Sequence, residues 1–109
     1  MEFNFKYKEK HFSIDVEKCE NYFSRAIGLM FRKKSKSLLF VFRKQTKQPI
    51  HSFFCKPFIA IWFYDRKIID IKFVKPWQIS VFPLGKFDRL LEIPVNNNDF
   101  DSVKFLIQK

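Results

Sequence analysis

The sequence is poor in the residues that make disordered chains and metal sites. Its 109 residues include only two glycines and five prolines, which argues against disorder. Its two cysteines, Cys19 and Cys55, lie too far apart for a CxxC pair, and with the two histidines they match no zinc-binding pattern. The chain also lacks a phosphate-binding loop and a hydrolase nucleophile elbow. We therefore predict no metal, no cofactor and no catalytic residue.

Long apolar segments are missing as well. No run approaches the roughly 18 apolar residues of a membrane-spanning helix, so we expect no membrane span. Residues 1–6 have no charged lead followed by an apolar core, so we expect no secretory signal. Both expectations favour a cytoplasmic protein, in which the cysteines stay free thiols because the compartment is reducing.

Acidic residues are absent from Asn21 to Tyr64, a stretch that carries nine of the 21 lysines and arginines. A charge run of this kind is usually a solvated face. A basic surface also binds partners that carry phosphate, which gives the stretch a second interpretation. If residues 32–47 bind nucleic acid or another polyanion, the contacts that we predict are Lys33, Lys34, Lys36, Arg43, Lys44 and Lys47.

Phenylalanine, by contrast, is abundant, with 16 copies. Large rings bury much area per residue, so we expect residues 1–109 to form a single domain around an aromatic core. The apolar run from Phe58 to Tyr64 has no polar alternation, which predicts a strand that is buried on both faces and opened by Pro57. We expect the rest of the chain to cover this strand.

Alternating apolar and polar residues, or short apolar runs, predict further strands at 3–7, 11–17, 38–42, 50–54, 67–74, 89–95 and 103–107. The polar residues at 8–10 and 65–66 predict tight turns of antiparallel hairpins. We expect residues 43–48 to be a basic connection between strands.

The apolar period changes between Cys19 and Ile27, where spacings of i, i+3, i+4, i+7 and i+8 predict a short helix that Gly28 stops. No strand–helix–strand alternation repeats. The predicted fold is therefore mainly β (α+β): a small antiparallel sheet, curled or partly closed as a barrel, with one short helix after the first hairpin.

The segment from Arg25 to Arg32 reads R-x-x-G-L-M-F-R. An apolar strand follows, and then Ile50-His51-Ser52-Phe53-Phe54, Lys75-Pro76-Trp77 and Leu91-Glu92-Ile93-Pro94. This ordered set resembles archaeal-type members of family number 192 among the domains of unknown function. The resemblance implies a compact, mostly β domain and no particular activity, because the family is uncharacterised. It also marks two departures: Cys55 stands where relatives carry Met, and Ala60 where they carry Asp.

Five residues with a polar or polarisable tip on an apolar framework are our candidates for lining a pocket: Met30, Arg32, His51, Trp77 and Glu92. For each of them, packing or a structural hydrogen bond is the commoner role. His51 and Cys55, oriented by Glu92, would be a conceivable nucleophilic site. Residues i and i+4 on an extended strand stand about 13 Å apart, however, which argues against direct contact.

Three functions follow from this sequence. The first is a small non-catalytic binding or interaction domain with a cleft at the end of the barrel-like sheet. The second is a nucleic-acid-binding protein that uses the stretch 32–47 together with exposed rings. The third, an enzyme with a Cys/His site, ranks last. The partner stays open between a protein, a nucleic acid and another polyanion.

Overall fold

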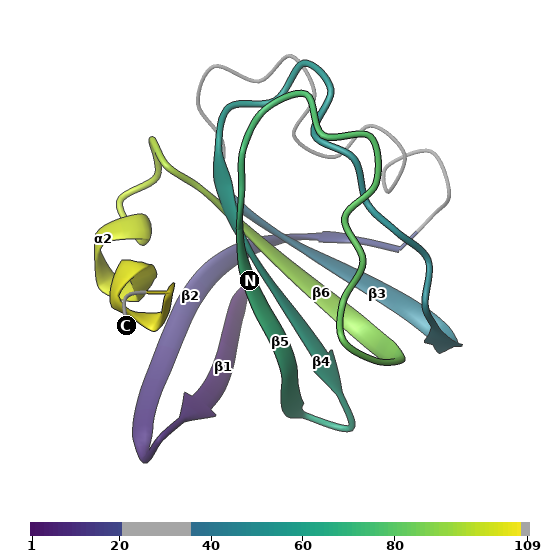
Figure 1. Ribbon diagram of the computed structural model, residues 1–109. Coiled ribbons are helices and arrows are strands. Elements are labelled where there is room, and N and C mark those ends of the chain that lie inside the picture. Colours follow the sequence, from purple (N-terminus) through teal and green to yellow (C-terminus); the bar gives the residue numbers. More distant parts are fainter. Residues whose placement is uncertain (21–35, 108–109) are drawn as a thin grey trace.

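The computed structural model describes residues 1–20 and 36–107, which form one six-stranded sheet (Figure 1). In chain order the strands are β1 (Glu2–Tyr7), β2 (Lys10–Cys19), β3 (Ser37–Thr46), β4 (Phe58–Tyr64), β5 (Lys67–Val74) and β6 (Phe87–Pro94). Their order in the sheet is β1-β2-β3-β6-β4-β5. Neighbouring strands are antiparallel except β2 and β3, which are parallel. The prediction of a mainly β fold with a curled sheet is confirmed.

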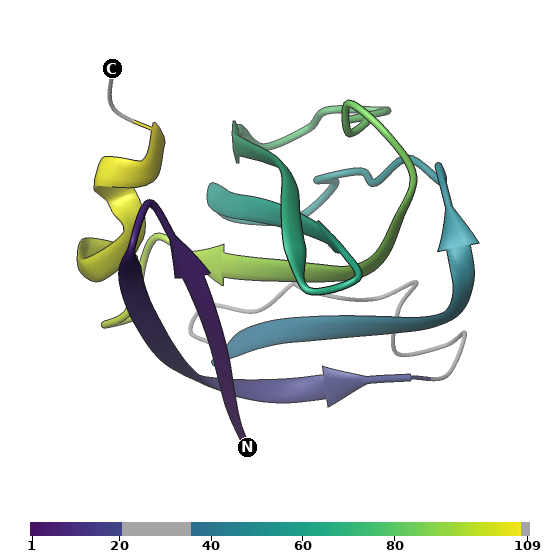
Figure 2. The same ribbon diagram turned by 90° about the horizontal axis from the view of Figure 1, so that it is seen from below.

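The sheet curls into a half-barrel, and the short helix α2 (Phe100–Val103) lies at the same end as the β1–β2 hairpin (Figure 2). A 3-10 helix, η1 (Lys104–Ile107), continues it. Val103 is fully buried, and Phe100 packs beside it against the apolar side chains of the sheet. The helix therefore covers one face of the sheet through apolar contacts.

β4 lies between β6 and β5, and six of its seven residues are buried. Its side chains alternate between two hydrophobic clusters. Ile59, Ile61 and Phe63 join Val103 in what we call the helix-side cluster. Phe58, Ala60 and Trp62 join Ile50 and Val81 in what we call the loop-side cluster. The prediction of a strand buried on both faces is confirmed.

The half-barrel closes through rings rather than through a ladder of hydrogen bonds. In the described sheet β1 pairs only with β2. Its Phe3 and Phe5 rings instead pack on Phe63 of β4, with centroids 5.2 and 5.5 Å from that ring. Each edge-to-face contact of this kind stabilises a core by about 0.5–1.5 kcal/mol beyond the area that it buries.

Both predicted tight turns are confirmed. Lys8-Glu9 joins β1 to β2, and Asp65-Arg66 joins β4 to β5. All four residues have positive φ, between 49° and 67°. Two-residue hairpin turns need this left-handed backbone because it matches the twist of the flanking strands.

The predicted last strand at 103–107 is wrong, because this segment is helical. Phe100, Val103 and Leu106 recur every three residues and all contact the helix-side cluster. A spacing of three suits a helix lying on the sheet. The same residues also contain the two-residue alternation of Val103, Phe105 and Ile107, on which the strand prediction relied.

Three other parts of the fold differ from the prediction. A strand at 50–54 is wrong, since only Ile50 forms a bridge, to Val81, before the chain turns. β3 continues through Thr46, so the connection expected at 43–48 starts later. Cys19 ends β2 and is buried in the loop-side cluster rather than opening a helix. The rest of the predicted helix and Gly28 lie outside the described residues.

Candidate functional site

Two loops, residues 50–57 and 75–86, meet side by side at one end of the sheet, in teal and green at the top of Figure 1. From Phe82 onward the second loop runs back along β5 to the start of β6, at the other end of the sheet. We call them together the loop platform. Ile50 and Val81 join them by a pair of backbone hydrogen bonds of 3.0 and 2.8 Å. The loops are therefore one structural unit, although the residues that join them lie 23 or more positions apart in the sequence.

Ser52 is the main connection between the two loops, and it is fully buried. Its hydroxyl donates to the Lys75 carbonyl at 2.5 Å and accepts the Gln78 N–H at 2.8 Å. Its backbone N–H donates to the Gln78 carbonyl, and its carbonyl accepts the Trp77 N–H, both at 3.0 Å. One buried serine thus satisfies four polar groups of the facing loop, which fixes the position of Trp77.

The platform carries a row of aromatic rings. His51 lies 5.3 Å from Phe53, and Phe53 lies 6.1 Å from Trp77. Phe54 meets Trp77 edge-to-face at 4.8 Å. Phe54 and Trp77 remain 49% and 60% exposed. Rings held in place by neighbouring rings and yet open to solvent are suited to contact a planar ligand.

Phe54 and Trp77 also have strained backbones, with φ of 59° and 65°. In the described part of the chain, the other non-glycine residues with positive φ belong to the two hairpin turns. Bulky residues rarely adopt this conformation, and such outliers concentrate at functional sites. The strain is maintained here by hydrogen bonds, because the Trp77 N–H is held by Ser52.

Replacing Trp77 with Gly should give a protein about 1 kcal/mol more stable than replacing it with Ala, because only Gly adopts positive φ without strain. Both variants lose the same exposed ring and keep the N–H that bonds to Ser52. Urea denaturation of the two variants checks this. Equal stability, or a more stable Ala variant, would show that the left-handed backbone at Trp77 is not strained.

Glu92 lies beneath the platform, on β6, with 5% of its surface exposed. Its Cα partners are Leu38 on β3 and Ala60 on β4, so its side chain faces the loop-side cluster. Among the described residues no hydrogen bond or ion pair reaches its carboxyl. Burial raises the pKa of this carboxyl to about 8, so it is mostly protonated at neutral pH.

Cys55 is half-buried, and its thiol donates to the Phe53 carbonyl at 3.4 Å. Burial, with the nearby charge of Glu92, raises the pKa of this thiol to about 11. The His51 Nδ1 accepts the Phe53 N–H at 3.2 Å and is therefore engaged with the backbone. Since the thiolate is the nucleophile, a thiol with a raised pKa is a poor one at neutral pH.

The three described members of the predicted pocket therefore converge on one end of the molecule. His51 and Trp77 are connected through the Phe53 ring, and Glu92 acts on Cys55 of the same loop. Met30 and Arg32 lie outside the described residues. Within residues 1–20 and 36–107, no group of three His, Cys, Asp or Glu side chains could hold a metal ion.

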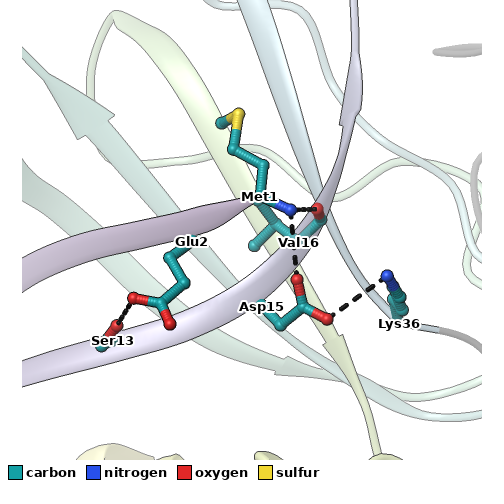
Figure 3. A network of polar contacts seen from close by, with 6 residues as sticks. All are labelled: Met1, Glu2, Ser13, Asp15, Val16 and Lys36. Carbon is teal, nitrogen blue, oxygen red and sulfur yellow. Dashed lines mark hydrogen bonds and ion pairs between the residues drawn. The ribbon is translucent and has the colours of Figure 1, made fainter.

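The predicted anion contacts do not form one patch in the described part of the chain. Lys36 precedes β3 and pairs at 3.3 Å with Asp15, which also binds the Met1 ammonium at 3.2 Å (Figure 3). These two cations hold the pKa of Asp15 below its usual range. Arg43 is seven residues further along an extended strand, roughly 23 Å away.

At that far end of β3, Arg43 and Lys44 line an open groove of about 570 Å³ together with Phe42 and Gln48. Lys47 follows the strand and is exposed. Lys33 and Lys34 lie outside the described residues. The basic stretch is thus divided between the two ends of β3.

Known proteins share this fold and these motifs. The family model DUF192, described as "Uncharacterized ACR", matches residues 4–102. The chain belongs to the DUF192 family. A UPF0127 protein of Pyrococcus horikoshii, PH1112, is 31% identical over 84 residues, covering 73% of this chain and 72% of that protein. The UPF0127 protein PF1050 of Pyrococcus furiosus is 32% identical over 78 residues, covering 68% and 67%. The predicted resemblance is confirmed.

Solved structures share the fold of this DUF192 chain. A protein of unknown function from Novosphingobium aromaticivorans superimposes with a TM-score of 0.77 at 18% identity, covering 93% of this chain and 76% of that one. A protein from Sinorhizobium meliloti described as a candidate transcription regulator gives 0.76 at 17% identity, covering 93% and 82%. Identities this low establish a common fold and carry no activity over. Among the described residues, no helix is both long enough and apolar enough to cross a membrane.

Two of the positions at which this chain departs from the resembled DUF192 pattern, Cys55 and Ala60, lie near Glu92. Ala60 is its Cα partner across β4 and β6, and Cys55 is the thiol whose pKa its charge affects. Where the pattern has Asp at position 60, two carboxyl groups would face each other. This DUF192 chain keeps only one of them, in an apolar setting.

Ser52 is the site residue that the sequence analysis missed. Within the segment Ile50–Phe54 it stood as the unspecified position of the resembled motif. A small hydroxyl residue between apolar neighbours is the signal that could have found it, because a buried serine must bond to something. Its partners, 23 and 26 residues away, could not be read from the sequence.

Proposed function

We propose that this protein is a non-catalytic binding domain and that its loop platform binds single-stranded nucleic acid. The observation that carries the proposal is the gathering of exposed apolar side chains on the two loops. Of the eight large hydrophobic side chains that are exposed in the described part of the chain, five lie there: Phe54, Trp77, Ile79, Phe82 and Leu84. An exposed apolar concentration on one surface is a mark of a binding site.

The charge of the platform supports an anionic partner. Residues 50–57 and 75–86 contain no Asp or Glu. They contain Lys56, Lys75 and Lys86, all exposed, and none of the three forms an ion pair with another described residue. Rings flanked by unpaired cations suit a chain of phosphates that carries planar bases.

Single strands fit this surface better than duplexes do. Every unpaired base has a free π-face that can stack on Trp77 or Phe54, whereas the bases of a duplex are stacked on each other. Aromatic platforms combined with a basic surface are the usual way in which proteins bind single strands without sequence preference. The raised pKa of Cys55 supports a binding role over nucleophilic catalysis.

The test is titration with a short single-stranded oligonucleotide, monitored by fluorescence anisotropy over a salt series. With three lysine contacts, log Kobs should fall against log salt with a slope of about −2. Replacing Trp77 with Ala should weaken binding about tenfold, because stacking contributes about 1–3 kcal/mol per base. The duplex of the same sequence should bind more weakly.

Matched control variants are available in this chain. Tyr64→Ala removes an exposed ring at the β4–β5 hairpin, at the opposite end of β4 from Phe54 and Trp77, and should leave binding unchanged. Lys56→Gln removes one of the three platform lysines, and Lys67→Gln, which removes an exposed lysine outside the two loops, is its matched control. If polyglutamate binds as tightly as the oligonucleotide and Trp77→Ala has no effect on binding, the platform is a general polyanion surface and the proposal of base stacking is wrong. No binding at low salt would reject the proposal.

A further inference from the structure

A second concavity lies in the helix-side half of the molecule, away from the loop platform. It has a volume of about 350 Å³ and is bounded by β1 on one side and by β3, β6 and β4 on the other. Its apolar wall is made by Phe3, Leu39, Val41 and Phe63. We call it the inner cleft. Its size falls at the lower end of the range of small-molecule pockets, about 300–1,000 Å³.

The strand register places an arginine in this apolar wall. Arg89 on β6 is the Cα partner of Val41 on β3 and of Phe63 on β4. Paired residues on neighbouring strands point to the same face of a sheet. The Arg89 side chain therefore stands between Val41 and Phe63, it lines the cleft, and 38% of it is exposed.

Two more cations line the cleft at its edge. Lys18 on β2 is the Cα partner of Leu39, and Arg66 lies at the tip of the β4–β5 hairpin. Lys18 is already paired with Glu20 at 3.1 Å. Arg66 forms no ion pair within the described residues.

Of the two arginines, Arg89 has a weak ion-pair partner in the described structure, and Arg66 has none. The carboxylate nearest to Arg89 in the described structure is that of its chain neighbour Asp88, at 4.0 Å, which is too long for a hydrogen bond. The one acidic residue that lines the cleft is Glu2, whose carboxylate accepts a hydrogen bond from Ser13 on β2 at 2.9 Å (Figure 3). The cleft thus combines an apolar wall with positive charge that its own residues leave largely unmatched.

We propose that the inner cleft binds a small amphipathic carboxylate, with its apolar tail against Phe3 and Phe63 and its head on Arg89. A guanidinium presents two parallel N–H donors that match the two oxygens of a carboxylate. Arg66 lies at the tip of the β4–β5 hairpin, and its long, flexible side chain is placed to approach the carboxylate head of the ligand from solvent. This site is independent of the loop platform, so either proposal can fail without the other.

The experiment is an NMR titration of the 15N-labelled full chain with octanoate. Saturable shifts are expected at the amides of Val41, Phe63 and Arg89. Replacing Arg89 with Met keeps the length and apolar character of the side chain and should weaken binding about tenfold or more, because a charged hydrogen bond contributes about 1.5–3 kcal/mol. Arg43→Met, on β3 but outside the cleft, should bind octanoate as the wild type does.

Octanol provides the comparison that needs no variant, because it has the same tail without the charge. It should bind the wild type at least about tenfold more weakly than octanoate does. Three results would each overturn the proposal: no saturable shift at millimolar octanoate, octanol binding as tight as octanoate, or octanoate shifts confined to the loop platform. If Arg89→Met fails to fold, the octanoate and octanol titrations of the wild type decide.

Discussion

Replacing Glu92 with Gln should make the protein progressively more stable than the wild type as pH rises from about 4.5 to 8. The wild-type carboxyl has its pKa raised by burial to about 8 in the folded state, against 4.5 as its ordinary value. Between these values the folded protein keeps a proton that the unfolded chain has released. The wild type therefore loses stability with increasing pH, at about 1.4 kcal/mol per pH unit.

The sign follows from the number of bound protons. Below pH 4.5 both states of the wild type hold the proton, and Glu92 adds no pH dependence. At pH 7 the wild type has lost about 3 kcal/mol of its free energy of unfolding through this carboxyl. The loss stops growing once pH passes about 8, the pKa of Glu92 in the folded state. Gln has nearly the same shape and does not titrate, so any cost of its own buried amide is the same at every pH.

The measurement is urea denaturation of both proteins at several pH values across this window, comparing the difference in the free energy of unfolding. Glu9→Gln removes an exposed carboxyl from the β1–β2 turn and is the matched control. A difference between Glu92→Gln and wild type that stays flat with pH would mean that the Glu92 carboxyl ionises in the folded state with a partner of its own.

Replacing Ser52 with Ala should lower the free energy of unfolding by about 2 kcal/mol, because a buried group left without its hydrogen-bond partner costs about 1–3 kcal/mol. The change removes one hydroxyl, whose O–H donates to the Lys75 carbonyl and whose oxygen accepts the Gln78 N–H. It leaves the backbone bonds of residue 52 in place. The two loops should therefore remain together but hold Trp77 less firmly.

Ser80→Ala is the control for this variant, because Ser80 lies in the facing loop of the platform and is exposed. Thermal denaturation compares the two, and oligonucleotide titration shows whether the Trp77 contact weakens in folded Ser52→Ala protein. If Ser52→Ala and Ser80→Ala have the same melting temperature, the Ser52 hydroxyl does not hold the loops together.

Much of the sheet could be predicted because its strongest signals are local. Phe58–Tyr64 is apolar at every position, so it required a site buried on both faces, and β4 is that site. The turn at Asp65-Arg66 followed from two apolar runs separated by two polar residues. The 103–107 segment failed because five residues with alternating apolar positions fit a strand and a helix equally well, and the contact with the sheet decided between them.

The site was harder to predict because its geometry depends on contacts distant in sequence. Composition identified His51, Trp77 and Glu92 as side chains with polar tips in apolar surroundings, and the structure brings the described ones to one end of the sheet. The sequence could not show that Ser52 bonds to residues 75, 77 and 78, or that Arg89 stands in the apolar wall of the inner cleft. The register that places Arg89 between two strands is set by the whole sheet.

The closure of the half-barrel by rings has a consequence for access to its interior. β4 is hydrogen-bonded on both sides, whereas β1 has one paired neighbour in the described sheet and packs on β4 through the rings of Phe3, Phe5 and Phe63. The edge hairpin can therefore separate from β4 without breaking a ladder between them, so local opening here costs less than opening of the central strands. Since Phe3 also walls the inner cleft, the same fluctuation that exposes the core would admit a ligand, and a bound ligand would hold the seam shut.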